Sequence, residues 1–402
     1  MDTSKPGRRH FVRTGLAGLA GAALSSACKS SRETSSAPAK KTPDAKIIYR
    51  SLGRTGIRLP IVSMGAVSFD PGLYRLALAS GIRHFDTAPA YRNGNHERML
   101  GQVFKGLPRD SFVVATSFDP LHYLDRENRT FRKGTSGRLL LDSLEGSLRR
   151  LGLDHVDIFY LSYLFSHGST LYGPFVEALQ KAKQEGKIRC IGGATHENEP
   201  EVLRAAAESG IYDAVLTVYN FRQVQREEMN RAISQAARAG IGIVAMKTQA
   251  GASWDSESQR LVNMTAALKW ALQNESVHTA IPGITTAQQL ETDLAVMQNL
   301  ALTDAEKSNL ESVGALPYRF TSLFCQQCRR CVPQCPYRLE IPTLMRGYMY
   351  AYGYRSVSRA RETLREAGLA ALPCAQCSSC PVRCAVGFDV RSKALDLARI
   401  IC

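Results

Sequence analysis

Two short runs of cysteine near the end of this 402-residue chain share one spacing. Each run reads C-x2-C-x2-C-x3-C, and the members are Cys325, Cys328, Cys331 and Cys335, followed by Pro336, and Cys374, Cys377, Cys380 and Cys384. Two intervening residues let the chain wrap around a compact inorganic group, so that three thiolates of one run reach it together. The fourth thiolate follows a wider gap and points toward a neighbouring group. The repeat therefore predicts two adjacent groups that share their ligands between the runs.

This spacing is typical of bacterial ferredoxins, in which the runs bind [4Fe–4S] clusters. We predict two such clusters, one bound by Cys325, Cys328, Cys331 and Cys384 and the other by Cys374, Cys377, Cys380 and Cys335. Structural zinc would instead show separated cysteine pairs that close on one ion. Disulfides between such close cysteines are awkward, and the three remaining cysteines are odd in number, which argues against a disulfide framework. The chain is thus predicted to carry electrons.

The first residues have the features of an export signal. Arg8 and Arg9 precede Phe11 and a moderately apolar stretch of Ala, Gly and Leu over residues 14–27. This segment resembles a twin-arginine signal, and the stretch is too short to span a bilayer. Export in the folded state fits a protein whose clusters are inserted in the cytoplasm. We expect residues 1–27 to be a signal peptide and the protein to lie in the periplasm or cell envelope.

Cys28 directly follows the apolar stretch, and residues 28–46 have the composition of a flexible linker. A lipid on Cys28 would make the protein a lipoprotein, and we expect no other attachment to a membrane. Ser25 stands where the usual lipobox has leucine, so a plain secreted leader with an unstructured linker is the alternative.

Short β-branched apolar runs alternate with amphipathic helical patterns over residues 47–317. Strands are predicted at 60–67, 84–88, 112–117, 156–162, 189–195, 214–220, 242–247 and 279–283, and helices include 137–152, 170–185, 199–210 and 227–240. Eight β-α units of this length predict an α/β fold, a (β/α)8 TIM barrel with a parallel sheet. Residues 318–402 would form a ferredoxin-like α-helical domain. In such a barrel, chemistry takes place at the C-terminal ends of the strands.

The predicted strand ends resemble those of the aldo/keto reductase family. The similar segments are FDTAPAY from Phe85 to Tyr91, followed by Asn95 and Glu97, the opening LGRTG from Leu52, and Ile281-Pro282-Gly283, which the family places beside the pyrophosphate of its cofactor. A cluster segment similar to the one after Phe324 is fused to one branch of the family. The resemblance implies an oxidoreductase whose barrel is joined to a ferredoxin-type domain.

The resemblance also locates a catalytic tetrad of Asp, Tyr, Lys and His. Asp86 and Tyr91 match the first two positions, whereas Ser117 stands at the lysine position and Ser162 at the histidine position. Without a lysine, the charge of Asp86 would raise the pKa of Tyr91 and make it a poor acid–base catalyst. Lys247 could approach Asp86 across the barrel mouth, although an ordinary ion pair is the alternative.

The predicted nucleotide site departs from the family pattern too. No arginine or lysine directly follows Gly283 to mark a pocket for a 2′-phosphate, and Ala194 stands where relatives often keep a serine for the carboxamide. We therefore interpret Ile281, Pro282 and Gly283 as a weak remnant of a nucleotide site, and these departures argue against NAD(P)H.

Three functions remain open. The protein could be an oxidoreductase that passes electrons from a small-molecule substrate through two clusters, a non-catalytic electron-transfer or docking subunit for another envelope enzyme, or an NAD(P)H-dependent aldehyde or ketone reductase. The segment from Arg319 to Arg365 is rich in arginine, which suits an acidic redox partner. No nucleic-acid recognition motif accompanies this charge, so we expect no nucleic-acid partner.

Overall fold

The computed structural model describes residues 47–223, 225–250, 262–315, 325, 330–353, 357–385 and 387–401. The predicted signal peptide, the linker with Cys28, and Cys328 lie outside the described residues. Contacts group the chain from Asp44 to Cys402 in one compact unit. Among the helices described, none is long and apolar enough to cross a membrane.

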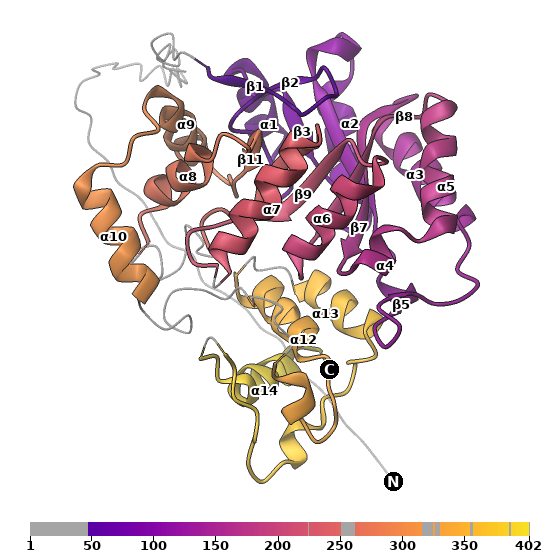
Figure 1. Ribbon diagram of the computed structural model, residues 1–402, viewed down its shortest axis with the longest axis vertical. Coiled ribbons are helices and arrows are strands. Elements are labelled where there is room, and N and C mark those ends of the chain that lie inside the picture. The colour runs from indigo at the N-terminus through magenta and orange to yellow at the C-terminus, as the bar shows by residue number, and fades with distance from the viewer. Residues whose placement is uncertain are drawn as a thin grey trace, which may run out of the picture. The chain divides into compact units, whose positions relative to one another are not determined.

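A parallel sheet of seven strands forms the centre of this unit (Figure 1). Its strands, in spatial and in chain order, are β3 (His84–Asp86), β4 (Val113–Phe118), β7 (Val156–Leu164), β8 (Ile188–Thr195), β9 (Ala214–Val218), β10 (Gly242–Met246) and β11 (Thr279–Ile281). Each overlaps a strand predicted from the sequence. Because neighbouring strands are parallel, all their C-terminal ends meet at one end of the sheet.

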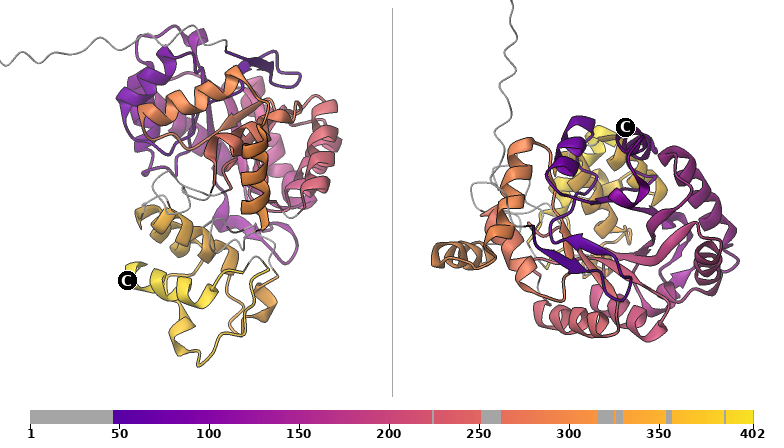
Figure 2. Two further views of the ribbon diagram at one scale, coloured as in Figure 1. Left: turned by 90° about the vertical axis from the view of Figure 1, so that its left-hand side faces the viewer. Right: turned by 90° about the horizontal axis from the view of Figure 1, so that it is seen from above.

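The sheet is closed into a barrel by residues 61–64 rather than by a regular eighth strand. Val62 forms a bridge to Ala280 of β11, and Met64 forms a bridge to Phe85 of β3. The first predicted strand is therefore reduced to a short segment that bonds alternately to its two neighbours. With this closure the prediction of a (β/α)8 barrel is confirmed, and the view from above shows the ring (Figure 2).

Helices surround the barrel. They are α1 (Pro71–Ala79), α2 (Asn95–Phe104), α3 (Arg138–Leu151), α4 (His167–Thr170), α5 (Gly173–Gln184), α6 (Glu199–Ser209), α7 (Arg226–Arg238), α8 (Met264–Gln273), α9 (Ala287–Ala295) and α10 (Asp304–Ala315). The helix predicted over residues 170–185 is divided between α4 and α5, because the chain leaves the helix at Tyr172 and Pro174 starts a new first turn. The other predicted helices match α3, α6 and α7.

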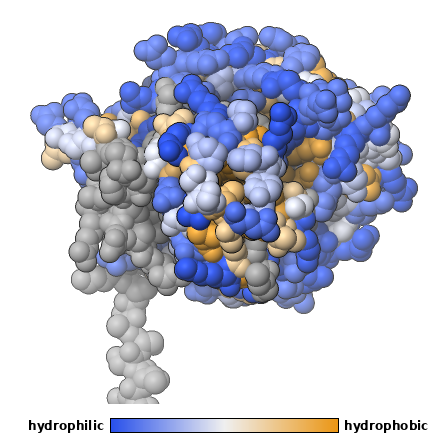
Figure 3. All heavy atoms as spheres, turned by 90° about the horizontal axis from the view of Figure 1, so that it is seen from below, coloured by the Kyte–Doolittle hydropathy of each residue, from blue (hydrophilic) through white to orange (hydrophobic). Residues whose placement is uncertain are grey.

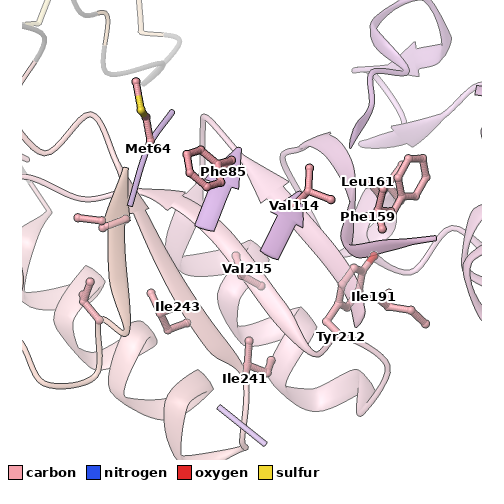
Figure 4. Close-up of a cluster of buried hydrophobic side chains, with 14 of the residues drawn as sticks. Met64, Phe85, Val114, Phe159, Leu161, Ile191, Tyr212, Val215, Ile241 and Ile243 are labelled. Atoms are coloured by element: carbon pink, nitrogen blue, oxygen red, sulfur yellow. The ribbon is translucent and has the colours of Figure 1, made fainter. Parts of the chain in front are cut away.

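Apolar side chains between the strands and the surrounding helices form the larger core (Figure 4). Phe85, Val114, Leu161, Val215 and Ile243 each lie on a different strand and are fully buried. Their neighbours in sequence point to the other face of the strand, because side chains alternate along it. The polar residues beside these apolar ones are therefore directed into the barrel.

A second core starts inside the barrel and continues into the C-terminal segment. Its members include Ile158 and Val244 of the strands and Leu344 of α12 (Ile341–Tyr348), which packs with α13 (Val357–Glu366) and α14 (Val390–Ile401). Figure 1 shows these three helices at the end of the barrel where β7 leads into α4. The C-terminal segment therefore covers the strand ends at which chemistry is expected.

A hairpin of β1 (Tyr49–Ser51) and β2 (Arg58–Pro60) lies at the opposite end of the barrel. The backbone N–H of Arg54 donates to the carbonyl oxygen of Gly240, just before β10 begins, at 2.7 Å. A Cβ on Gly53 would lie 2.3 Å from that oxygen, and its φ is +51°. Glycine is therefore required for this close approach.

Gly192 of β8 offers a test of packing inside the barrel. A Cβ there would lie 2.3 Å from Cδ1 of Tyr160 on β7. We expect Gly192→Ala to destabilise the protein by about 1–3 kcal/mol, because the ring must move. The midpoint of thermal unfolding, followed by circular dichroism, should fall.

Gly314→Ala is the matched control, since its added methyl group would meet nothing within 4 Å. It should leave the midpoint unchanged or raise it slightly. An unchanged midpoint in Gly192→Ala as well would mean that the Tyr160 ring does not fill the barrel interior.

Candidate functional site

Three of the residues predicted for the barrel site lie at neighbouring strand ends. Asp86 is the last residue of β3, Ser117 lies near the end of β4, and Ser162 lies in the last part of β7. All three are buried, and Tyr91 is half-buried in the turn that follows β3. The fold thus brings these four residues to one side of the barrel mouth.

Asp86 is held in an environment that favours its protonated form. Its Oδ2 atom is buried and has no hydrogen-bond partner among the described residues. Burial, and to a lesser extent the charge of Asp119, raises the pKa of Asp86 to about 8. The hydroxyl of Ser117 donates to Oδ1 of Asp119 at 2.9 Å. Asp86 is therefore mostly neutral at neutral pH, which removes much of the charge that was expected to act on Tyr91.

A buried histidine, His96, lies beside Tyr91. The ring of His96 lies 6.1 Å from that of Tyr91 and is held by the hydroxyls of Tyr74 at 2.8 Å and Thr87 at 2.7 Å. Burial lowers the pKa of His96 to about 4, so the ring is uncharged at neutral pH. His96 lies outside the tetrad pattern, and sequence reasoning missed it.

A second phenol, Tyr160, lies inside the barrel. Its hydroxyl is buried without a hydrogen-bond partner in the described part of the chain. Burial, followed by the charge of Asp86, raises its pKa well above the usual value. Tyr160 lies two residues before Ser162 and so on the same face of β7. This alternation was the signal in the sequence that could have identified it.

Lys247 follows β10 with a φ of +55°. Burial, followed by the charge of Arg346, lowers its pKa to about 7, whereas Glu199 and Cys325 act in the opposite direction. The charges that act most on Lys247 thus include two residues of the C-terminal segment. Asp86, the partner that the sequence suggested, is not among them.

Two histidines follow strands β7 and β8 near the mouth. The ring of His196 lies 5.2 Å from that of Tyr163. His167 is exposed, and its backbone N–H donates to Glu201 Oε1 at 2.9 Å. Cys190 is buried in β8, where burial raises its pKa to about 12, so it behaves as a small apolar residue.

Four cysteines from the two runs line one pocket beneath α12. They are Cys335 of the first run and Cys374, Cys377 and Cys380 of the second. Burial raises the pKa of the Cys374 thiol, and the charges of the other three raise it further. This is the ligand set predicted for one cluster, and thiolates around a shared cavity fit an iron–sulfur group.

The alternatives to a cluster receive no support from the described residues. No disulfide joins the described cysteines. No group of three or more His, Cys, Asp or Glu side chains within the described ranges is arranged around a single metal ion. Four thiols that line one pocket are the donor set that a [4Fe–4S] cluster takes.

The other predicted ligand set is described in part. Cys325, Cys331 and Cys384 are half-buried or buried, and Cys328 lies outside the described residues. Gln334 joins the two runs, because its side-chain oxygen accepts from the backbone N–H of Arg383 at 2.6 Å and its nitrogen donates to the carbonyl of Arg330 at 2.8 Å. The runs are thereby held side by side, as crossed ligands require.

Comparisons with known proteins agree with this geometry. Residues 72–265 match the aldo/keto reductase family, and residues 324–389 match the 4Fe-4S dicluster domain. The chain carries an aldo/keto reductase domain joined to a 4Fe-4S dicluster domain. It is an oxidoreductase of the aldo/keto reductase superfamily.

Similar proteins with described activities cover most of the aldo/keto reductase domain. L-galactose dehydrogenase of Arabidopsis thaliana is 27% identical over 67% of this chain and 94% of its own length. L-glyceraldehyde 3-phosphate reductase of Escherichia coli K12 is 26% identical over 65% of this chain and 91% of its own length. NADH-specific methylglyoxal reductase of the same strain is 25% identical over 58% of this chain and 84% of its own length.

Among solved structures, the holo form of aldo-keto reductase AKR11C1 from Bacillus halodurans superimposes with a TM-score of 0.53. It is 20% identical and covers 69% of this chain and all of its own length. At this identity, the likeness establishes the fold alone.

The predicted nucleotide-site residues begin at the end of β11. Ile281 is the last residue of that strand, and Pro282 and Gly283 lead toward α9. At the start of α9, Thr285 donates its N–H and hydroxyl to Gln289 Oε1 at 2.7 and 2.8 Å. Thr286 accepts in turn from the Gln289 N–H. Several polar groups of this turn are therefore already hydrogen-bonded to one another.

The raised pKa of Asp86 predicts a pH dependence of stability. The carboxyl group keeps its proton up to about pH 8 when folded, but loses it near its ordinary value of 3.8 when unfolded. Its contribution to stability is therefore complete at low pH and is lost as the pH rises from about 4 to 8. In this window, the unfolding free energy of the wild type should fall relative to that of Asp86→Asn, by up to about 1.4 kcal/mol per pH unit.

Denaturant unfolding of both proteins at pH 5.5 and pH 7.5 measures this difference. The difference infrared spectrum, wild type minus Asp86→Asn, should also contain a carboxylic-acid carbonyl band at neutral pH. Parallel pH profiles and the absence of that band would mean that Asp86 is ionised in the folded protein.

Proposed function

We propose that the protein passes electrons between a small-molecule substrate at the mouth of the aldo/keto reductase barrel and an external redox protein, through two [4Fe–4S] clusters. The observation that carries this proposal is that Cys335 shares a pocket with Cys374, Cys377 and Cys380, while Cys325 acts on Lys247 at the barrel mouth. The cluster held through Cys325 would thus adjoin the barrel. The cluster held in the pocket of Cys374 would be the second carrier on the electron path.

When bound, each cluster supplies a one-electron carrier. The dicluster domain surrounds the second set of thiols with donors. Arg391 donates to the carbonyl of Cys377 at 2.8 Å, and Arg383 donates to the carbonyl of Cys380 at 2.9 Å. Their positive charges stabilise thiolates and added electrons.

On the barrel side, we propose that Ser117 and Ser162 replace the lysine and histidine of the family tetrad. This proposal is supported by the hydrogen bond that the Ser117 hydroxyl donates to Asp119, and by the largely protonated state of Asp86. A neutral carboxylic acid can donate a hydrogen bond to a substrate oxygen. The site is then suited to proton transfer beside electron transfer more than to hydride transfer from a nicotinamide.

We propose that the redox partner is acidic and docks on the dicluster domain. Arg330, Arg338 and Arg383 are exposed, and Tyr337 beside them lines the pocket of the second ligand set. Figure 3 views this end of the molecule, where hydrophobic atoms lie within a largely hydrophilic surface. Export by the twin-arginine route, with or without a lipid on Cys28, would place this surface among the redox proteins of the cell envelope.

An NAD(P)H-dependent carbonyl reductase is the second candidate function. It is favoured by the similarity to L-galactose dehydrogenase and to an NADH-specific methylglyoxal reductase, since aldo/keto reductases commonly use NAD(P)H. In that case, Tyr91 would protonate the carbonyl oxygen, and the clusters would be accessory.

Cysteine variants test the crossed ligand sets. Replacing Cys335 or Cys374 with serine should each remove about half of the bound iron, because each variant removes one ligand of the same cluster. The double variant Cys335→Ser/Cys374→Ser should lose no more iron than either single variant. Iron and acid-labile sulfide per chain, with electron paramagnetic resonance of the reduced protein, measure this.

Cys331→Ser/Cys335→Ser is the discriminating variant, because its two cysteines belong to one run but to different clusters. It should lose nearly all the iron, whereas Cys190→Ser should retain it all. If Cys331→Ser/Cys335→Ser instead keeps about half of the iron, each run binds its own cluster.

Calorimetric titration of NADH and of NADPH into anaerobically purified protein separates the two candidate functions. We expect no micromolar binding, because no basic residue directly follows Gly283 and the turn before α9 is already hydrogen-bonded. Micromolar binding, together with loss of aldehyde-dependent NADH oxidation in Tyr91→Phe, would establish the reductase instead.

A further inference from the structure

Arg346 extends from the dicluster domain to the mouth of the aldo/keto reductase barrel. It lies in the last turn of α12 and is only 3% exposed. Its guanidinium carbon lies 4.9 Å from the ring centre of Tyr163, which is near the C-terminal end of β7. The side chain therefore lies buried where substrates of such barrels bind.

This buried guanidinium has no carboxylate partner among the described residues. Its hydrogen bond is a long one, from Nη2 to Thr343 Oγ1 at 3.4 Å, and its Nε has no partner in the described chain. Buried charges in proteins are normally paired, because an unpaired one is strongly destabilising. The arginine is thus equipped for a negatively charged group that the described part of the chain does not provide.

The acidic residues around the mouth are engaged elsewhere. Glu197 forms an ion pair with Arg126, and Glu340 lies 3.6 Å from the same arginine. Glu199 acts on Lys247, and its own pKa is raised to about 7 by burial, so it carries only part of a charge at neutral pH. Within the described ranges, Arg126 is therefore neutralised by acidic residues, whereas Arg346 is not.

Lys247 adds a second positive group beside Arg346, since the charge of Arg346 lowers the pKa of Lys247. Two cations that repel each other in a buried site are both stabilised by an anion placed between them. A guanidinium also offers two parallel donors that match a carboxylate or a phosphate.

We propose that Arg346 and Lys247 bind the anionic group, a carboxylate or a phosphate, of a small substrate in the barrel mouth. The rest of that molecule would extend into the barrel toward Asp86 and Tyr160, whose buried oxygens have unused hydrogen-bonding capacity among the described residues. This inference rests on the proposed function, because it names the substrate class of the same site. The dicluster domain would then contribute substrate recognition as well as electron transfer.

Anion binding to the intact, cluster-loaded protein tests the proposal. The probes are inorganic phosphate and glycerate, with glycerol as the uncharged analogue of glycerate and sodium chloride at matched ionic strength. Calorimetry and the shift in thermal unfolding should both detect phosphate or glycerate but not glycerol, because a ligand of the folded state raises its stability. Arg346→Gln should weaken this binding at least about thirtyfold.

Arg399→Gln is the matched control, because it removes an exposed arginine of the same domain and leaves the mouth intact. It should bind the anions as the wild type does. Without ligand, Arg346→Gln should unfold at the same temperature as the wild type or a higher one, since it removes an unpaired buried charge. Its iron content confirms that the variant is folded and loaded.

Three outcomes would overturn the proposal: no anion binding by the loaded wild type, equal binding by Arg346→Gln, or displacement of phosphate by NADH. The last would assign the site to the pyrophosphate of a dinucleotide instead of a substrate. Failure of the proposed electron path can be distinguished from these outcomes. It would appear as missing iron, or as a cluster that no partner reduces, independently of the anion-binding measurements.

Discussion

The packing of the dicluster domain over the C-terminal end of the barrel is the constraint on which the rest of the structure depends. One continuous apolar core runs from the barrel interior to α12, and the ion pairs of Arg126 join the loop between β5 (Leu124–Asp125) and β6 (Thr130–Phe131) to Glu197 and Glu340. Because this cover excludes water from the mouth, the groups enclosed there have shifted pKa values and strengthened electrostatic interactions. The dicluster domain and the barrel therefore enclose the mouth together.

The enclosed mouth has two chemically different sides. On one, Asp86 and Tyr160 keep their protons and offer neutral hydrogen-bond donors. On the other, Arg346 carries a positive charge, and Lys247, whose pKa is lowered to about 7, carries part of one and is acted on by Cys325. A substrate held between them would meet proton donors at one end and the electron path at the other. In the proposed function, this division takes the place of the compact tetrad that the family resemblance implies.

Much of the fold was predictable because its signals are local. Alternating apolar runs located all seven strands of the sheet, and glycines such as Gly152, with a φ of +68°, located helix ends. The eighth strand was less regular than predicted, since residues 61–64 divide their bonds between β3 and β11. At the site, the strand-end resemblance predicted Asp86, Tyr91, Ser117 and Ser162, and the fold places these four residues on one side of the barrel mouth. Sequence reasoning missed His96, Tyr160 and Arg346, because their importance comes from neighbours distant in the chain.

The sequence by itself determined the chemistry that the chain can contain: thiols at cluster spacing, the alternation of a barrel, and an aspartate and two serines at the strand ends. Spacing and alternation are properties of consecutive residues, so they can be read without coordinates. Only the tertiary structure decided which groups meet. It grouped Cys335 with the thiols of the other run, brought Lys247 within the electrostatic influence of Arg346 and Cys325, and buried the guanidinium of Arg346 without a carboxylate partner among the described residues. Burial and distance between remote segments set these charges, and no local pattern encodes them.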